Sequence, residues 1–265
     1  HSFPTRRSSD LIGLRRETAP GRVLAVALGV VLVIDPWAVL AAGFLAADPA
    51  RYFSLADRVA WRLGTPAPGQ TRLEDILHTL YRRGDALIGS DATLLLGDSH
   101  LHGFPTSLLP GSVNFSIGGE TAAHLAERVA DYTAPLRVRQ VVLLTGRNDL
   151  AQGRAPEAVA ESVGRILGYI PQRTVVVLLG IPTVRSGGNA VHSTREANRL
   201  LAEACAARPG CRFVSTETLA DASGALDARF ASADGVHLNP AGYAELAALI
   251  AAATQPQNQT PLPRR

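Results

Sequence analysis

Two short runs of consecutive apolar residues, Val141–Leu144 and Val175–Leu179, constrain the fold of this 265-residue chain more than any other feature. Such runs are typical of strands that are buried on both faces, as in a parallel sheet covered by helices. From residue 90 onward, similar runs alternate with segments of helical length, which predicts repeated strand–helix–strand units. We therefore expect an α/β fold with strands at residues 92–96, 112–116, 139–145, 174–180 and 212–215, and helices near residues 120–133, 155–169, 192–207 and 240–253.

Charge and cysteine content exclude several classes of protein. The formal net charge is +3, but many of the arginines lie near the two ends of the chain, and no basic stripe is interleaved with aromatic residues. We therefore expect no nucleic-acid partner. The only cysteines, Cys205 and Cys211, have neither CxxC spacing nor a histidine cluster, so we expect no zinc site. The two are compatible with a disulfide, formed outside the cytoplasm, or with free thiols.

The first 47 residues differ from the rest of the chain. Residues 1–11 resemble the translation of a common sequencing-adapter oligonucleotide, and we exclude them from the fold as non-native. Residues 23–34 form an apolar run preceded by arginines, and a second apolar stretch continues to residue 47. Together they exceed the roughly 20 residues that span a bilayer, and the first run alone has the length of a signal-peptide core. We expect residues 12–47 to be a membrane anchor or export signal, with membrane attachment through residues 23–47.

Two other interpretations of this segment stay open. It is also compatible with a buried helix of a soluble protein. In addition, residues 12–44 resemble a membrane stretch of bacterial DNA-uptake competence channels, which would make the chain a chimera joined near Phe44 and its remaining domain cytoplasmic.

The segments that flank the strand–helix region have simpler patterns. Residues 48–88 predict two amphipathic helices that form a linker, the second beginning with a capping box at Thr71 and Glu74. Residues 89–254 contain the strand–helix alternation and form the predicted main domain. The tail, residues 255–265, is polar and rich in proline, which predicts disorder.

Four polar motifs lie at the ends of predicted strands or just before the last helix: Gly97-Asp98-Ser99-His100, Gly118-Gly119, Gly146-Arg147-Asn148-Asp149 and Asp234-Gly-Val-His237. Each motif alone is typical of an ordinary turn. In a parallel sheet, however, the carboxyl ends of the strands share one edge, where ligands bind. The four motifs are therefore predicted to meet.

The residue types in these motifs suit nucleophilic catalysis. An aspartate three residues before a histidine can orient the imidazole through Nδ1, which leaves Nε2 free to take a proton from a serine. Backbone N–H groups after Gly-Gly and an asparagine amide can stabilise a developing oxyanion.

In this order, the four motifs resemble those of the SGNH hydrolases, the GDSL family of esterases and lipases, over about residues 90–253. The resemblance implies a flavodoxin-like three-layer α/β/α fold with five parallel strands, preceded here by the hydrophobic and amphipathic helices. It also implies hydrolysis of esters, thioesters or carbohydrate O-acyl groups without a metal or other cofactor. The resemblance identifies Ser99 as the nucleophile, His237 as the base and Asp234 as the orienting acid. It assigns the oxyanion hole to the N–H of Ser99, the N–H of Gly119 and the side chain of Asn148.

Other residues of the motifs are less clearly assigned. Gly118 is the neighbouring candidate for the glycine donor, and His100 stands where the family signature has leucine. We expect His100, His102, Gly118 and Arg147 to line the cleft. The short connection from Ser99 to Gly119 predicts an open acyl pocket.

The sequence thus predicts a serine esterase for small acyl groups, acting outside the cytoplasm on glycan or lipid esters. The alternatives are an O-acyltransferase that uses the same residues and an SGNH-like binding domain without activity.

Overall fold

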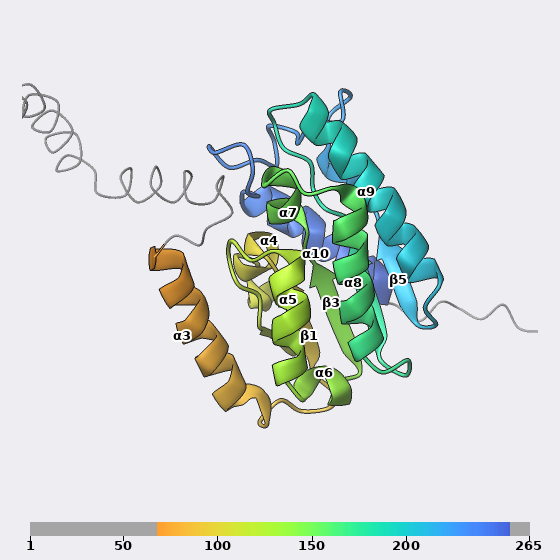
Figure 1. Cartoon of the computed structure of the whole chain (residues 1–265). Helices are drawn as coiled ribbons and strands as arrows, with labels where there is room; N and C mark the ends of the chain where they lie inside the picture. Colours follow the sequence, from red (N-terminus) through yellow and green to blue (C-terminus); the bar gives the residue numbers. More distant parts are fainter. Residues whose placement is uncertain (1–67, 255–265) are drawn as a thin grey trace, which may run out of the picture. The chain divides into compact units, whose positions relative to one another are not determined.

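The computed structural model describes residues 68–254 of the chain (Figure 1). The predicted adapter-like start, apolar segment, first amphipathic helix and tail lie outside the described residues. The chain divides into two units, His1–Ala56 and Asp57–Arg265, and all described residues belong to the second. No helix within the described range is long and apolar enough to cross a membrane.

Five strands form one parallel sheet in the order β2-β1-β3-β4-β5. The strands are β1 (Thr93–Gly97), β2 (Ser112–Asn114), β3 (Gln140–Leu144), β4 (Val175–Leu179) and β5 (Cys211–Val214). The chain passes from β1 to β2 on one side and then crosses back to β3 on the other. The carboxyl ends of β1 and β3 therefore form a switch point, where open α/β sheets bind ligands.

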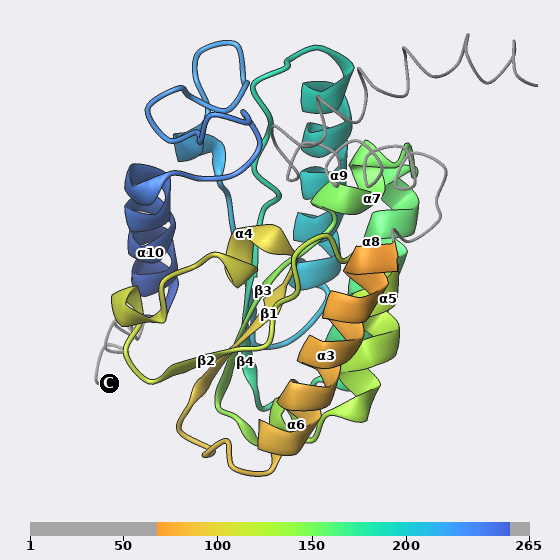
Figure 2. The same ribbon diagram turned by 90° about the vertical axis from the view of Figure 1, so that its left-hand side faces the viewer.

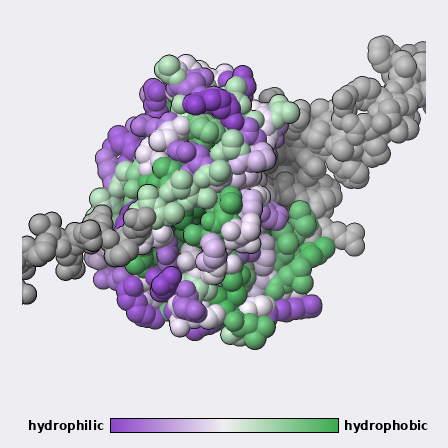
Figure 3. Space-filling model, turned by 180° about the vertical axis from the view of Figure 1, so that it is seen from behind, coloured by the Kyte–Doolittle hydropathy of each residue, from purple (hydrophilic) through white to green (hydrophobic). Residues whose placement is uncertain are grey.

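Helices cover both faces of the sheet, and Figure 2 shows the three layers edge-on. One layer contains α5 (Ala122–Arg128), α8 (Pro156–Tyr169) and α9 (Asn189–Ala206), and the other contains α10 (Pro240–Thr254). Leu94 and Leu96 belong to the core of the first layer, whereas Leu95 belongs to that of the second. This alternation follows from the two-residue period of a strand. Figure 3 shows the molecule from behind, where polar and apolar residues are interspersed. The predicted α/β/α sandwich is confirmed.

One predicted helix is wrong as a continuous element. Instead of a helix over residues 120–133, α5 ends at Arg128, a 3₁₀ turn (Val129–Asp131) follows, and α6 (Ala134–Arg137) begins beyond Tyr132. Tyr132 has extended backbone at φ −110° and is fully buried. Burial of this ring and the proline at position 135, which suits a helix start, interrupt the helical pattern.

The helix before the sheet, α3 (Pro68–Asp85), begins three residues before the predicted capping box, so the predicted start at Thr71 is wrong. Its contacts with the sheet domain are aromatic and polar. The Tyr81 ring stacks on Phe115 with centroids 4.7 Å apart, and the Asp85 carboxylate accepts the N–H groups of Thr133 and Ala134.

Three other residues of the apolar stripe of α3 contribute little to this attachment. The side chains of Leu73, Ile76 and Leu80 remain 47–51% exposed. The predicted helix is present, and one residue of its apolar pattern, Tyr81, packs on the sheet domain.

The two cysteines, whose state the sequence left open, form a disulfide. Cys205 near the end of α9 pairs with Cys211 at the start of β5, with Cα atoms 5.3 Å apart. The bridge lies at the amino end of β5, the edge of the sheet opposite the four motifs.

Candidate active site

Ser99 lies at the carboxyl end of β1, as the first residue of the short helix α4 (Ser99–His102). Asp98 caps this helix by accepting the backbone N–H of His100. Gly97 lets the turn fit against β3, because an added Cβ would lie only 2.0 Å from the carbonyl oxygen of Leu144. The Gly-Asp-Ser sequence therefore forms a tight strand-to-helix turn that presents the serine at the edge of the sheet.

His237 lies beside Ser99 although the two are far apart in sequence. Its Nε2 is 2.9 Å from Ser99 Oγ, and its Nδ1 is 2.6 Å from Asp234 Oδ2. The loop before α10 shapes this arrangement locally, since Asp234 Oδ1 also accepts the backbone N–H groups of Val236 and His237. The structure thus brings together the three residues predicted as nucleophile, base and orienting acid.

The same hydrogen bonds set the charge of Asp234. Partial burial raises the pKa of its carboxyl, but the hydrogen bonds from the His237 ring and from two backbone N–H groups outweigh burial and lower the pKa to about 2. The carboxylate is therefore ionised at neutral pH and accepts the Nδ1 hydrogen of His237. That contact places the lone pair of the imidazole at Nε2, toward Ser99.

The loop between β2 and α5 supplies the backbone donors. The N–H of Ile117 donates to the carbonyl of Gly97, which holds this loop against the Ser99 turn. A Cβ added at Gly118 would lie 3.7 Å from Ser99 Cβ, so the backbone of this loop passes directly beside the serine. Gly119 has a φ of +83°, a conformation that glycine adopts without strain.

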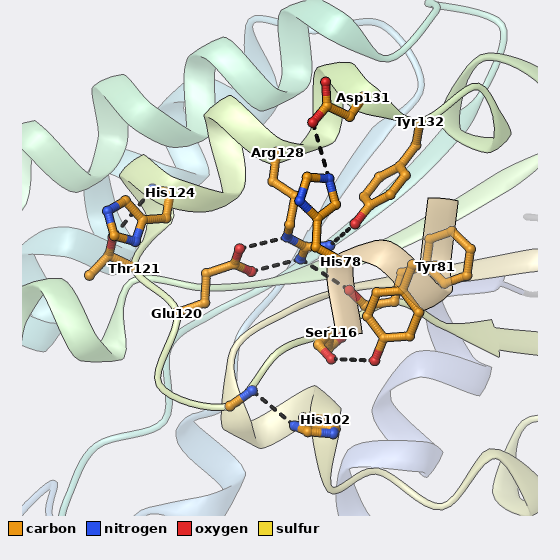
Figure 4. A network of polar contacts seen from close by, with 12 residues as sticks. His78, Tyr81, His102, Ser116, Glu120, Thr121, His124, Arg128, Asp131 and Tyr132 are labelled. Carbon is orange, nitrogen blue, oxygen red and sulfur yellow. Dashed lines mark hydrogen bonds and ion pairs between the residues drawn. The ribbon is translucent and has the colours of Figure 1, made fainter. Parts of the chain in front are cut away.

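His102 distinguishes the two glycines. Its Nδ1 accepts the N–H of Gly118 at 2.9 Å (Figure 4). Partial burial lowers the pKa of His102, which keeps the ring neutral and Nδ1 able to accept. Within residues 68–254, by contrast, the N–H groups of Ser99 and Gly119 have no protein acceptor. The geometry therefore leaves Gly119, rather than Gly118, with a donor available to a ligand.

Asn148 follows β3 on the short helix α7 (Arg147–Ala151). Its Nδ2 donates one hydrogen to the carbonyl of Glu120 at 2.8 Å, which ties the asparagine to the glycine loop. An amide nitrogen has a second hydrogen, which this contact does not use.

A buried ion pair that the sequence did not reveal supports the glycine loop. The Arg128 guanidinium donates to both carboxylate oxygens of Glu120, at 2.6 and 2.7 Å, and to the Phe115 carbonyl at 3.0 Å. Figure 4 shows this network, which includes the Tyr132 hydroxyl at 2.7 Å. Arg128 thus holds both ends of the segment that contains the two glycines.

The network was missed because neither residue stands out in the sequence. Glu120 and Arg128 are eight residues apart. In the sequence, they look like ordinary charged residues, the first at the start of a predicted helix and the second within it. Only the fold shows that both are buried, at 3% and 7% exposure.

Two of the predicted cleft residues do not line a cleft. His100 is completely buried, and Arg147 is 5% exposed and donates to the hydroxyl of Thr194. Both side chains point to polar partners inside the protein rather than to solvent, so these two predictions are wrong. Gly118 is half-buried and His102 is exposed beside Ser99, in keeping with positions in the cleft.

Comparison with known proteins identifies the family. The sequence model of the GDSL-like lipase/acylhydrolase family matches residues 95–245, more than half of the chain. The chain therefore belongs to this family of hydrolases. No curated protein is significantly similar to the chain in sequence.

Several solved structures have a similar fold. A protein described as a platelet activating factor from Streptococcus pneumoniae is 22% identical, with a TM-score of 0.64 over 69% of this chain and 93% of that one. A GDSL-like lipase from Bacteroides thetaiotaomicron is 20% identical, with a TM-score of 0.57 over 66% and 96% of the two chains. An acylhydrolase from Bacteroides fragilis is 22% identical, with a TM-score of 0.56 over 66% and 94%. At these identities the likeness concerns the fold.

Proposed function

We propose that this protein is a serine esterase that hydrolyses carboxylic esters of small acyl groups through an acyl-enzyme. The observation that carries the proposal is the continuous hydrogen-bonded series from Ser99 Oγ through the His237 imidazole to Asp234, with contacts of 2.9 and 2.6 Å. This geometry is within the reach required for proton transfer between a nucleophile and its base.

In the first half of the reaction, Ser99 Oγ attacks the acyl carbonyl carbon while its proton moves to His237 Nε2. The carbonyl oxygen becomes an oxyanion, stabilised by the N–H groups of Ser99 and Gly119 and by the Asn148 amide. The bond from carbon to the alcohol oxygen then breaks, and His237 returns the proton to the departing alcohol. Asp234 stabilises the imidazolium that exists between these two transfers.

In the second half, water replaces the alcohol. His237 accepts a proton from the water as its oxygen attacks the acyl carbon, and then returns that proton to Ser99 as the acid leaves. An O-acyltransferase would use the same residues, with a sugar hydroxyl in place of water.

Hydrolysis of p-nitrophenyl acetate and of longer p-nitrophenyl esters tests the proposal. Ser99→Ala is expected to abolish turnover, whereas Ser193→Ala, a serine substitution on α9, is expected to leave it unchanged. Turnover that persists in Ser99→Ala would refute the mechanism. Product analysis with an O-acetylated polysaccharide and a free acceptor separates hydrolysis from acyl transfer.

We also propose that the protein acts outside the cytoplasm, on glycan or lipid esters of the cell envelope. The Cys205–Cys211 disulfide supports this location, because such bridges are rare in reducing compartments. The apolar run at residues 23–34, preceded by arginines, also supports it. Alkylation of intact cells that express the full chain is expected to label neither cysteine without prior reduction. Labelling of both would contradict this location.

A further inference from the structure

His100, the residue after Ser99, is completely buried and uses both of its ring nitrogens. Nδ1 lies 3.1 Å from Asp98 Oδ1, and Nε2 lies 3.2 Å from the carbonyl oxygen of Val236. The first contact is local to the serine turn. The second crosses 136 positions of sequence to the loop before α10.

The partner of Nε2 gives this contact its importance. Val236 directly precedes His237 and follows Asp234 by two positions, so its carbonyl belongs to the short loop that carries the base and its acid. The rings of His100 and His237 lie side by side, with centroids 5.8 Å apart. His100, which directly follows the nucleophile in the sequence, thus contacts the backbone that directly precedes the base.

The chemistry of the two contacts explains why a histidine suits this position. A carboxylate oxygen and a backbone carbonyl are both acceptors, and an imidazole can donate to both when each ring nitrogen has a hydrogen. Asp98 is also fully buried, so its contact with Nδ1 is made away from solvent. A leucine would fill a similar volume but would leave the Val236 carbonyl without this donor.

We propose that His100 is a positioning residue that sets the approach of His237 to Ser99 by holding the Val236 carbonyl. This inference rests on the esterase function proposed above. It predicts that loss of the His100–Val236 hydrogen bond lengthens the distance from Ser99 Oγ to His237 Nε2 and slows proton transfer. Substrate binding, which does not use this bond, is expected to change little.

A pair of amide variants tests the inference, because the two differ by a single methylene group. In His100→Gln, the amide nitrogen can reach the Val236 carbonyl. In His100→Asn, the shorter side chain can contact Asp98 but not Val236. We expect His100→Asn to lower kcat about 10- to 100-fold with KM nearly unchanged, the range in which small misplacements of catalytic groups fall. His100→Gln is expected to recover most of that loss.

Three further measurements complete the experiment. His192→Leu, a histidine substitution on the exposed side of α9, is the control and is expected to retain the activity of the unsubstituted protein. Ser99→Ala measures the background. Crystal structures of the two amide variants report the distance from Ser99 Oγ to His237 Nε2 without depending on turnover.

The outcomes separate this inference from the proposed function. A longer distance and a lower kcat in His100→Asn, both recovered in His100→Gln, support the positioning role. Equal kinetics and equal distances in the two amide variants overturn it, as does a failure of both to fold, which would show that His100 serves stability. If the unsubstituted protein has no esterase activity, the proposed function fails, and the two crystal structures still decide whether His100 positions the base.

Discussion

Replacing Arg128 with methionine would remove the guanidinium that pairs with the buried carboxylate of Glu120. The two residues are 7% and 3% exposed, and the pair is held by two hydrogen bonds of 2.6 and 2.7 Å. Methionine preserves much of the apolar stem but leaves a buried carboxylate without its cation. Breaking a buried ion pair on one side costs about 3–5 kcal/mol.

This loss is large compared with the roughly 5–15 kcal/mol that stabilises a typical domain. For a domain of this size, each kcal/mol corresponds to about 2–4 °C in Tm, so the variant should melt about 6–20 °C lower. Because the same pair holds the loop that contains Gly119, we also expect esterase activity to fall more than the folded fraction does.

The size of the effect depends on pH. Burial raises the pKa of Glu120 in the native protein, and Arg128 opposes that shift. Without Arg128, the folded-state pKa of Glu120 moves further above its ordinary range. A carboxyl group with a raised folded-state pKa binds its proton more tightly in the folded than in the unfolded protein. The variant is therefore least destabilised below the unfolded-state pKa of the carboxyl group, and its stability falls as pH rises from there through the folded-state pKa.

Urea unfolding at pH 5 and pH 8 checks both the magnitude and the sign. The control is the double variant Glu120→Gln/Arg128→Met, in which the buried group is neutral. It is expected to recover part of the stability and to lose the pH dependence. A loss below about 1 kcal/mol in Arg128→Met, or an equal loss at both pH values, would show that Glu120 is not held as a buried carboxylate by Arg128.

Three other predictions follow from the site and the disulfide. Asn148→Ala should lower kcat about 10²- to 10³-fold with little change in KM, because the lost donor acts on charge formed in the transition state; an unchanged kcat in steady-state assays would remove Asn148 from the oxyanion hole. Asp234→Asn should lower kcat about 10⁴-fold by disturbing the tautomer of His237, and retention of activity between pH 6 and 9 would argue against an orienting role. Reduction of the Cys205–Cys211 bridge, which closes a short loop with a sequence separation of 6, should cost about 2 kcal/mol in urea unfolding while esterase activity persists. Loss of activity in the reduced, folded protein would contradict the independence of bridge and site.

Strands β1, β3 and β4 could be located from sequence because each is a short, mostly apolar run that ends at turn residues. Their observed limits differ from the predicted ones by two residues at most. Helix limits depended more on tertiary contacts. The interruption at Tyr132 coincides with a fully buried ring, and burial of that kind depends on residues that are distant in the sequence.

The sequence by itself determined the order of elements and the four motifs, because strand periodicity, turn chemistry and the Asp-x-x-His spacing are local properties. It also placed Ser99, His237 and Asp234 at one edge of the sheet, since the carboxyl ends of parallel strands meet there.

Only the tertiary structure decided which polar residues face inward. His100 and Arg147 were expected in the cleft but are buried, and Glu120 and Arg128, which no sequence motif singles out, form a buried pair. Burial of a polar side chain depends on partners that come from distant segments, such as the Val236 carbonyl that faces His100 across 136 residues. Sequence periodicity contains no information about such partners, because they become neighbours only when the chain has folded.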